Sequence, residues 1–102
     1  MERTLNRAIG KKCRRFSIST SSKVDPVGVF STTENTDVVI WADCAFAYSI
    51  GDAPSVTLPN EGNTGDVVWP ANMVARIGIP AGQKIAAAAI SGTGYINLLP
   101  GV

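Results

Sequence analysis

The segment VVIWA, residues 38 to 42, is apolar at every position and is rich in β-branched side chains. A short run of this composition predicts a β-strand, and because neither face is polar we expect it at the centre of a sheet or between two layers. Residues 44 to 50 continue the extended pattern, with larger side chains alternating with small ones. Together the two runs predict either one long strand bent near Asp43 or two strands with a bulge between them.

Turn-forming residues divide the rest of the chain into further short segments. Ten Gly and six Pro occur among 102 residues, and Val, Ile, Thr and Ser fill the intervals between them. Alternating or apolar runs predict strands over residues 16 to 19, 27 to 30, 55 to 58, 67 to 69 and 73 to 79. This arrangement is typical of an all-β protein.

Residues 84 to 90, KIAAAAI, carry two conflicting signals. Four alanines favour a helix by intrinsic propensity. However, the segment has only seven residues and lies between Gly82 and Gly92, and so short a helix is marginal. We therefore predict a strand, which pairs with residues 95 to 99 as a hairpin across residues 91 to 94.

The composition allows one modest hydrophobic core. Hydrophobic residues make up 45% of the chain and charged residues 17%, which excludes a disordered protein and leaves some apolar surface. About eight short strands suit a β-sandwich of two antiparallel sheets, with the jelly roll as one topology that they allow. We assign this domain to residues 16 to 102.

The first 15 residues form a basic block that we interpret as an extended N-terminal arm. They contain six Lys and Arg against one Glu, a net charge of +5, and the remaining residues contain three against seven, a net charge of −4. Segregated charge of this kind is typical of an interaction tail. Its target is either nucleic-acid phosphates or an acidic protein surface. The candidate partner-binding residues are Arg3, Leu5, Arg7, Ile9, Lys11, Lys12, Arg14 and Arg15.

Few residues in the sequence suggest catalysis. The chain has no His, the commonest general base and metal ligand, and we expect no enzyme activity, cofactor or metal. Asp37 and Asp43 could act as paired carboxylates, but solvated strand ends are the simpler interpretation. Gly92-Thr93-Gly94 is read as a hairpin turn, because no lysine follows it as in a phosphate-binding loop.

The remaining candidates are surface contacts and thiols. We select Trp69, which lies beside Pro70 at a predicted strand end, and Met73 as residues that could contact a partner. Cys13 and Cys44 have no metal-binding spacing, and we expect two free thiols in a reducing compartment. No apolar run is long enough to span a membrane, so synthesis in a cytoplasm is expected.

Three motifs carry a resemblance to a known group of proteins: IGDAPSV at residues 50 to 56, WPA at residues 69 to 71 and IPAGQKIA at residues 79 to 86. In this order, and followed by a closing Gly-rich hairpin, they resemble small β-sandwich virion proteins of tailed bacteriophages. The resemblance covers residues 38 to 99, and the basic arm has no counterpart in it.

The resemblance implies a cement, or decoration, protein on the outer surface of an icosahedral phage capsid. Its partners would be the major capsid protein and further copies of itself, with a trimer favoured, and it would be made in the bacterial host cytoplasm and end in the virion. Nucleic acid and membranes are not expected partners.

Two other interpretations remain open. The aromatic residues could instead form a carbohydrate-binding or adhesin-like module, because flat rings stack on sugars. A head-completion or tail component of a phage is the other alternative, since small sandwiches also occur there.

Overall fold

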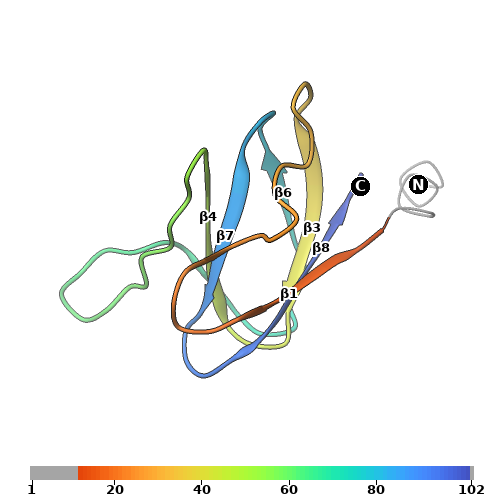
Figure 1. Cartoon of the computed structure of the whole chain (residues 1–102). Helices are drawn as coiled ribbons and strands as arrows, with labels where there is room; N and C mark the ends of the chain where they lie inside the picture. Colours follow the sequence, from red (N-terminus) through yellow and green to blue (C-terminus); the bar gives the residue numbers. More distant parts are fainter. Residues whose placement is uncertain (1–11, 102) are drawn as a thin grey trace.

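The computed structural model describes residues 12–101, and their regular secondary structure consists entirely of β-strands (Figure 1). The strands are β1 (Arg14–Ile18), β2 (Lys23–Val24), β3 (Thr36–Ala42), β4 (Phe46–Gly51), β5 (Val68–Trp69), β6 (Ala75–Ile79), β7 (Lys84–Ala89) and β8 (Gly94–Pro100). The all-β class expected from the sequence is thus confirmed.

The strands form two antiparallel sheets of four. The first sheet has the order β1-β8-β3-β6, and the second has the order β2-β7-β4-β5. Figure 1 shows β4 and β7 in one layer and β1, β3 and β8 in the other. The predicted arrangement of two antiparallel sheets packed as a sandwich is therefore compatible with the structure.

Every connection except that from β4 to β5 passes from one sheet to the other. The predicted hairpin between residues 84 to 90 and 95 to 99 is consequently wrong, because β7 pairs with β4 and β2 while β8 pairs with β1 and β3. The chain around Asp43 is likewise neither a bent strand nor a bulge. It leads from β3 in the first sheet to β4 in the second.

The hydrophobic core lies between the two sheets. The first sheet contributes large aliphatic side chains, among them Ile40, Ile96 and Leu98, and the second contributes Phe46 and Ile85. All residues of β7 from Ile85 to Ala89 are buried. The alanines therefore suit a central strand with both faces covered, where tertiary packing outweighs their helix propensity.

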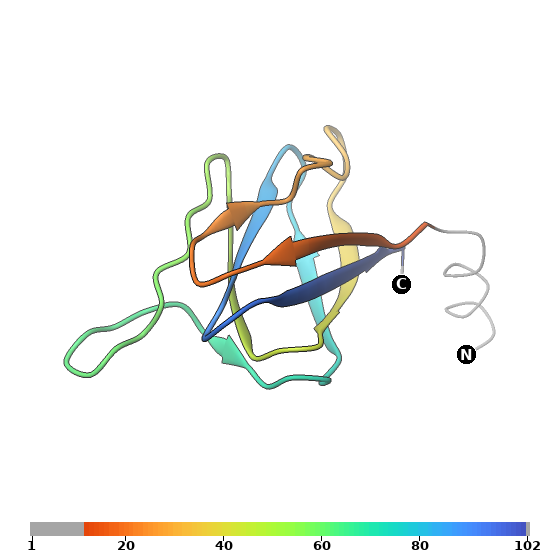
Figure 2. The ribbon, with the colours of Figure 1, turned by 60° about the horizontal axis from the view of Figure 1, so that its bottom comes forward.

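Two of the strands predicted from the sequence are absent from residues 12–101. Residues 27 to 30 form no strand, although Phe30 packs against the core. Residues 55 to 58 also pair with no sheet; the amide of Val56 donates instead to Ser22 Oγ at 2.9 Å. Thr57 and Asp66 then bond to each other at the base of a loop that projects from the sandwich (Figure 2).

Overpacking β7 gives the first testable prediction. Ala87 is fully buried in the core, so Ala87→Leu should lower the free energy of unfolding by about 1 to 3 kcal/mol, because the added carbons must displace packed neighbours. Chemical denaturation would measure the change. The matched control is Ala53→Leu at an exposed position, which should change stability little; equal effects of the two substitutions would contradict the buried position of β7.

Candidate binding surface

The residues predicted for the basic arm fall into two groups. Arg3, Leu5, Arg7, Ile9 and Lys11 lie outside the residues that the structure describes. Lys12 is exposed just before β1, whereas Arg14 and Arg15 are the first two residues of β1 itself. The sheet thus begins at Arg14, earlier than the start at residue 16 that the charge pattern suggested. Charged residues in an outer strand can still pair with the next strand.

Arg14 has a structural role. Its guanidinium donates to the Asp25 carboxylate and to the carbonyl of Gly28, both at 2.9 Å, and lies 3.7 Å from the centre of the Phe30 ring. The Asp25 side chain is completely buried and also accepts from the amide of Val27. Arg14 therefore fastens the connection between β2 and β3 to the start of β1, and a partner cannot use its charge without undoing this contact.

Removing the buried carboxylate gives the second prediction. Asp25→Asn keeps the shape of the side chain but leaves the Arg14 guanidinium without its charged partner, so the free energy of unfolding should fall by about 3 kcal/mol. Equilibrium denaturation of this variant and of Asp52→Asn, at an exposed turn, would measure the difference. A loss no greater than that of Asp52→Asn would show that the ion pair does not stabilise the fold.

The outer face of the first sheet carries an apolar stripe, which we define as Val39, Trp41 and Leu99. Val38, Ile40 and Ala42 point into the core, and because side chains alternate along a strand, Val39 and Trp41 point outward. Leu99 lies opposite Val39 on the neighbouring strand. The three side chains are only partly buried. The expected position of residues 38 to 42 at the centre of a sheet is confirmed, because β3 lies between β8 and β6, and its outer face is less buried than its core face.

Polar and aromatic groups flank the stripe. Asn97 lies opposite both Arg15 and Trp41, and its side-chain oxygen accepts a 2.7 Å bond from Arg15 Nε. The Arg15 guanidinium also lies 5.8 Å from the centre of the half-exposed Tyr95 ring. On the other side of β3, Arg76 lies opposite Val39. An apolar centre is thus bordered by two guanidinium groups.

An apolar centre bordered by Arg and Tyr side chains is typical of protein-binding surfaces. Trp, Tyr and Arg are the residues most enriched where interface binding energy concentrates, around an apolar centre with a polar rim. The charge of Arg15 marked it as a candidate in the sequence. The outward position of Trp41 was missed, because an uninterrupted apolar run does not show which of its alternate residues face outward. The alternation of Arg15 and Ser17 with Phe16 and Ile18 was the available signal for this face.

The two predicted surface contacts differ in their surroundings. Trp69 packs partly buried against the core, and its Nε1 is buried without a hydrogen-bond partner among the described residues. Its ring therefore serves mainly packing within the domain. Met73 is 52% exposed and Val74 beside it 64% exposed, where the chain enters β6. Of the two candidates, only Met73 is well placed to meet a partner.

The polar residues considered as candidate sites in the sequence do not come together in the structure. Asp37 and Asp43 lie toward opposite ends of β3, and Asp43 accepts a 2.8 Å bond from the Tyr95 amide, which ties β8 to the end of β3. Within residues 12–101, no three potential metal-ligating side chains form a cluster. The same part of the chain contains no helix with the length and hydrophobicity needed to cross a membrane.

The two thiols differ in accessibility. Cys13 is exposed before β1, whereas Cys44 is partly buried, and both are free. Burial, with a smaller contribution from the negative charge of Asp43, raises the pKa of the Cys44 thiol. A side chain at Gly94 would collide with the Cys44 sulfur, so the close approach of these two turns requires glycine.

Alkylation kinetics provide the third prediction. Because the thiolate is the reactive form and the pKa of Cys44 is raised above its ordinary value of 9.0, Cys44 should react with iodoacetamide more slowly at neutral pH than Cys44 in an unfolded peptide. The rate should keep rising above pH 9.0. Mass spectrometry of Cys13→Ser protein would follow it, and a rate equal to that of the peptide would contradict the protected position.

Comparisons with protein-family models, curated proteins and solved structures find no match to this chain. The candidate surface is therefore interpreted from its own chemistry.

Proposed function

We propose that this protein is a structural component of a phage virion, a capsid decoration protein that stabilises the shell by binding across major capsid protein subunits. The observation that carries the proposal is the outward apolar stripe around Trp41, which the described residues leave partly exposed. Contiguous apolar side chains that remain partly exposed on one face are typical of a protein-binding site.

The order of strands supports a jelly-roll assignment within this proposal. In both sheets, strands from the two halves of the chain alternate, as β1-β8-β3-β6 and β2-β7-β4-β5. Double-sheet jelly rolls with eight strands occur in viral capsid proteins and in lectins. Fold alone does not determine function. The proposed function therefore depends on the apolar stripe and on the sequence resemblance, and the strand order agrees with both.

The basic residues give the proposal a second contact. The basic block of residues 1 to 12 joins the sandwich at β1, the strand that also presents Arg15 beside the outer face. The positive charge of this segment would attract an acidic surface of the shell. Because Arg14 and Arg15 belong to β1, a truncation that tests this segment should end at Lys12.

Shell binding tests the proposal and is the fourth prediction. The wild-type chain should bind saturably to expanded capsids of its own phage that lack it, as measured by co-sedimentation. Trp41→Ala should weaken binding about thirtyfold, which corresponds to the roughly 2 kcal/mol expected of a central interface residue. The unfolding midpoint of each variant reports whether its fold is intact.

The matched control is Val67→Ala, an exposed apolar residue beside β5 in the second sheet. This variant should bind like the wild type. Failure of the wild-type chain to bind shells would overturn the proposed function, whereas unchanged binding of Trp41→Ala would place the binding surface elsewhere on the domain.

Carbohydrate binding is the second candidate function. It is favoured by the partly exposed Trp41 ring lying beside the Arg15–Asn97 hydrogen bond, because sugar sites combine an aromatic platform with fixed polar groups. A glycan array distinguishes the two functions: binding to a defined glycan that Trp41→Ala abolishes, without shell binding, would support this candidate.

A further inference from the structure

The outer edge of β6 is an open hydrogen-bonding edge. β6 is the last strand of the first sheet, and among the strands of residues 12–101 it pairs only with β3. Its residues make no backbone hydrogen bond outside that ladder within the part of the chain described. The outer strands of the second sheet, β2 and β5, have two residues each, whereas β6 has five. An edge of this length can accept another strand.

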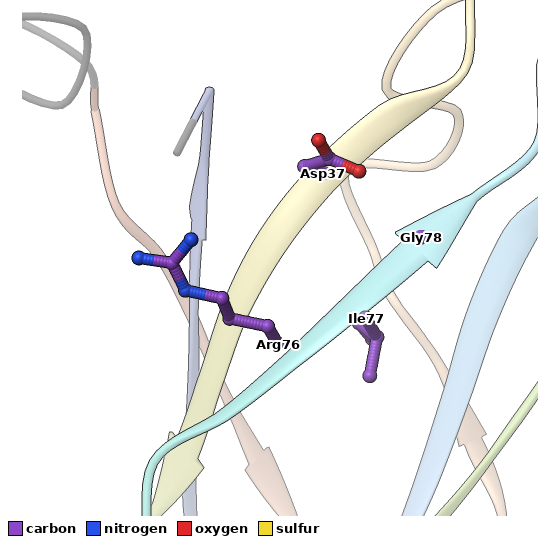
Figure 3. A pocket seen from close by; sticks show the side chains of 4 residues that line it. All are labelled: Asp37, Arg76, Ile77 and Gly78. Carbon is purple, nitrogen blue, oxygen red and sulfur yellow. The ribbon is translucent and has the colours of Figure 1, made fainter. Parts of the chain in front are cut away.

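Two residues of opposite charge lie near this edge on the outer face of the sheet: Arg76 on β6 and Asp37 on β3. Between Asp37 and the free edge, Gly78 leaves a position without a side chain. Asp37 is opposite Gly78 and Val39 is opposite Arg76, so both charged side chains project from the outer face. Neither forms an ion pair among the described residues, and Figure 3 shows the Arg76 side chain extending across β3 in this view, with its guanidinium apart from the Asp37 carboxylate. With Ile77 and Gly78 they line a shallow cavity of about 260 Å³. A Cβ at Gly78 would have only Asp37 Oδ1 nearby, at 3.9 Å.

We propose that two copies of this chain pair antiparallel through β6, about a twofold axis at Ile77. In that register Arg76 of one copy lies opposite Gly78 of the second copy. Beyond that glycine lies Asp37, two strand spacings or about 10 Å from the Arg76 backbone. A long arginine side chain can cross the bare glycine and meet the carboxylate, and the symmetry forms this ion pair twice.

The same register covers exposed apolar side chains. Val74 and Met73, which are 64% and 52% exposed, come opposite Pro80 and Ala81 of the second copy. At the axis, the two half-buried Ile77 side chains meet on the core side of the sheet. Each surface that one copy presents is therefore matched by the other, as a closed twofold interface requires.

A charge on an edge strand can also serve to prevent nonspecific pairing. What favours a specific pair here is the position of the opposite charge and of the glycine, which are complementary only in the twofold register. The contact is small, so we expect a weak dimer that forms at high local concentration. This inference does not rest on the proposed function. It differs from the trimer that the sequence resemblance implies.

Charge reversal tests the pairing and is the fifth prediction. Sedimentation equilibrium of the full chain, from micromolar to millimolar concentration, should show a monomer and a dimer. Arg76→Asp and Asp37→Arg should each raise the dissociation constant about tenfold or more, because like charges then face each other. The double variant, with the pair reversed, should return to within about threefold of the wild type.

Two further variants keep the test decisive if a single substitution disturbs folding. Gly78→Val adds a β-favouring side chain at an open position and should leave the unfolding midpoint intact while weakening the dimer, because it obstructs the path of Arg76. In protein with Cys13→Ser and Cys44→Ser, Ile77→Cys should form a disulfide-linked dimer on oxidation, since directly opposed Cβ atoms can approach to about 4.5 Å, which a disulfide can span.

The matched control for cross-linking is Ser17→Cys on β1, the opposite outer strand of the same sheet. It should give no linked dimer under the same conditions. A wild-type chain that stays monomeric over the whole concentration range, a trimer, or a double variant that remains dissociated would overturn the inference. Because shell binding is measured separately, each of these results leaves the proposed function to be decided on its own.

Discussion

The alternation of side chains along β3 is the constraint on which the rest of this structure depends. Burial of Val38, Ile40 and Ala42 between the sheets fixes the orientation of the strand. Val39 and Trp41 must then face outward, since a shift by one residue would expose the core. The stability of the core and the display of the apolar stripe are therefore two results of one register, and sequence changes that keep this register keep positions 39 and 41 on the outer face.

Much of the strand content could be predicted from the sequence, because local periodicity records which residues are extended. The segments around residues 38 to 42, 75 to 79 and 84 to 89 are strands as expected. Pairing could not be predicted in the same way. The turn between β7 and β8 can either fold back on its own strand or cross to the other sheet, and the choice depends on β7 being covered by β2 and β4, which no local pattern contains.

The candidate surface could likewise be predicted only in part from the sequence. Composition identified Arg14 and Arg15 as charges, but only the fold separates them: one is held by the buried Asp25, and the other lies beside Asn97. The sequence favoured Trp69, beside Pro70, as the exposed tryptophan, and placed Trp41 within an apolar strand. Their difference arises because Trp69 lies opposite Phe46 in the short β5–β4 pair and packs on the core, whereas Trp41 lies on the far side of β3.

The pairing of β1 with β8 affects how this domain can be synthesised. Among the strands of residues 12–101, β1 leaves the ribosome first, yet it pairs with β8, the last of them. The first sheet therefore cannot close around the core during translation until β8 has emerged. Contacts so distant in sequence slow folding and leave partly made chains with exposed strands.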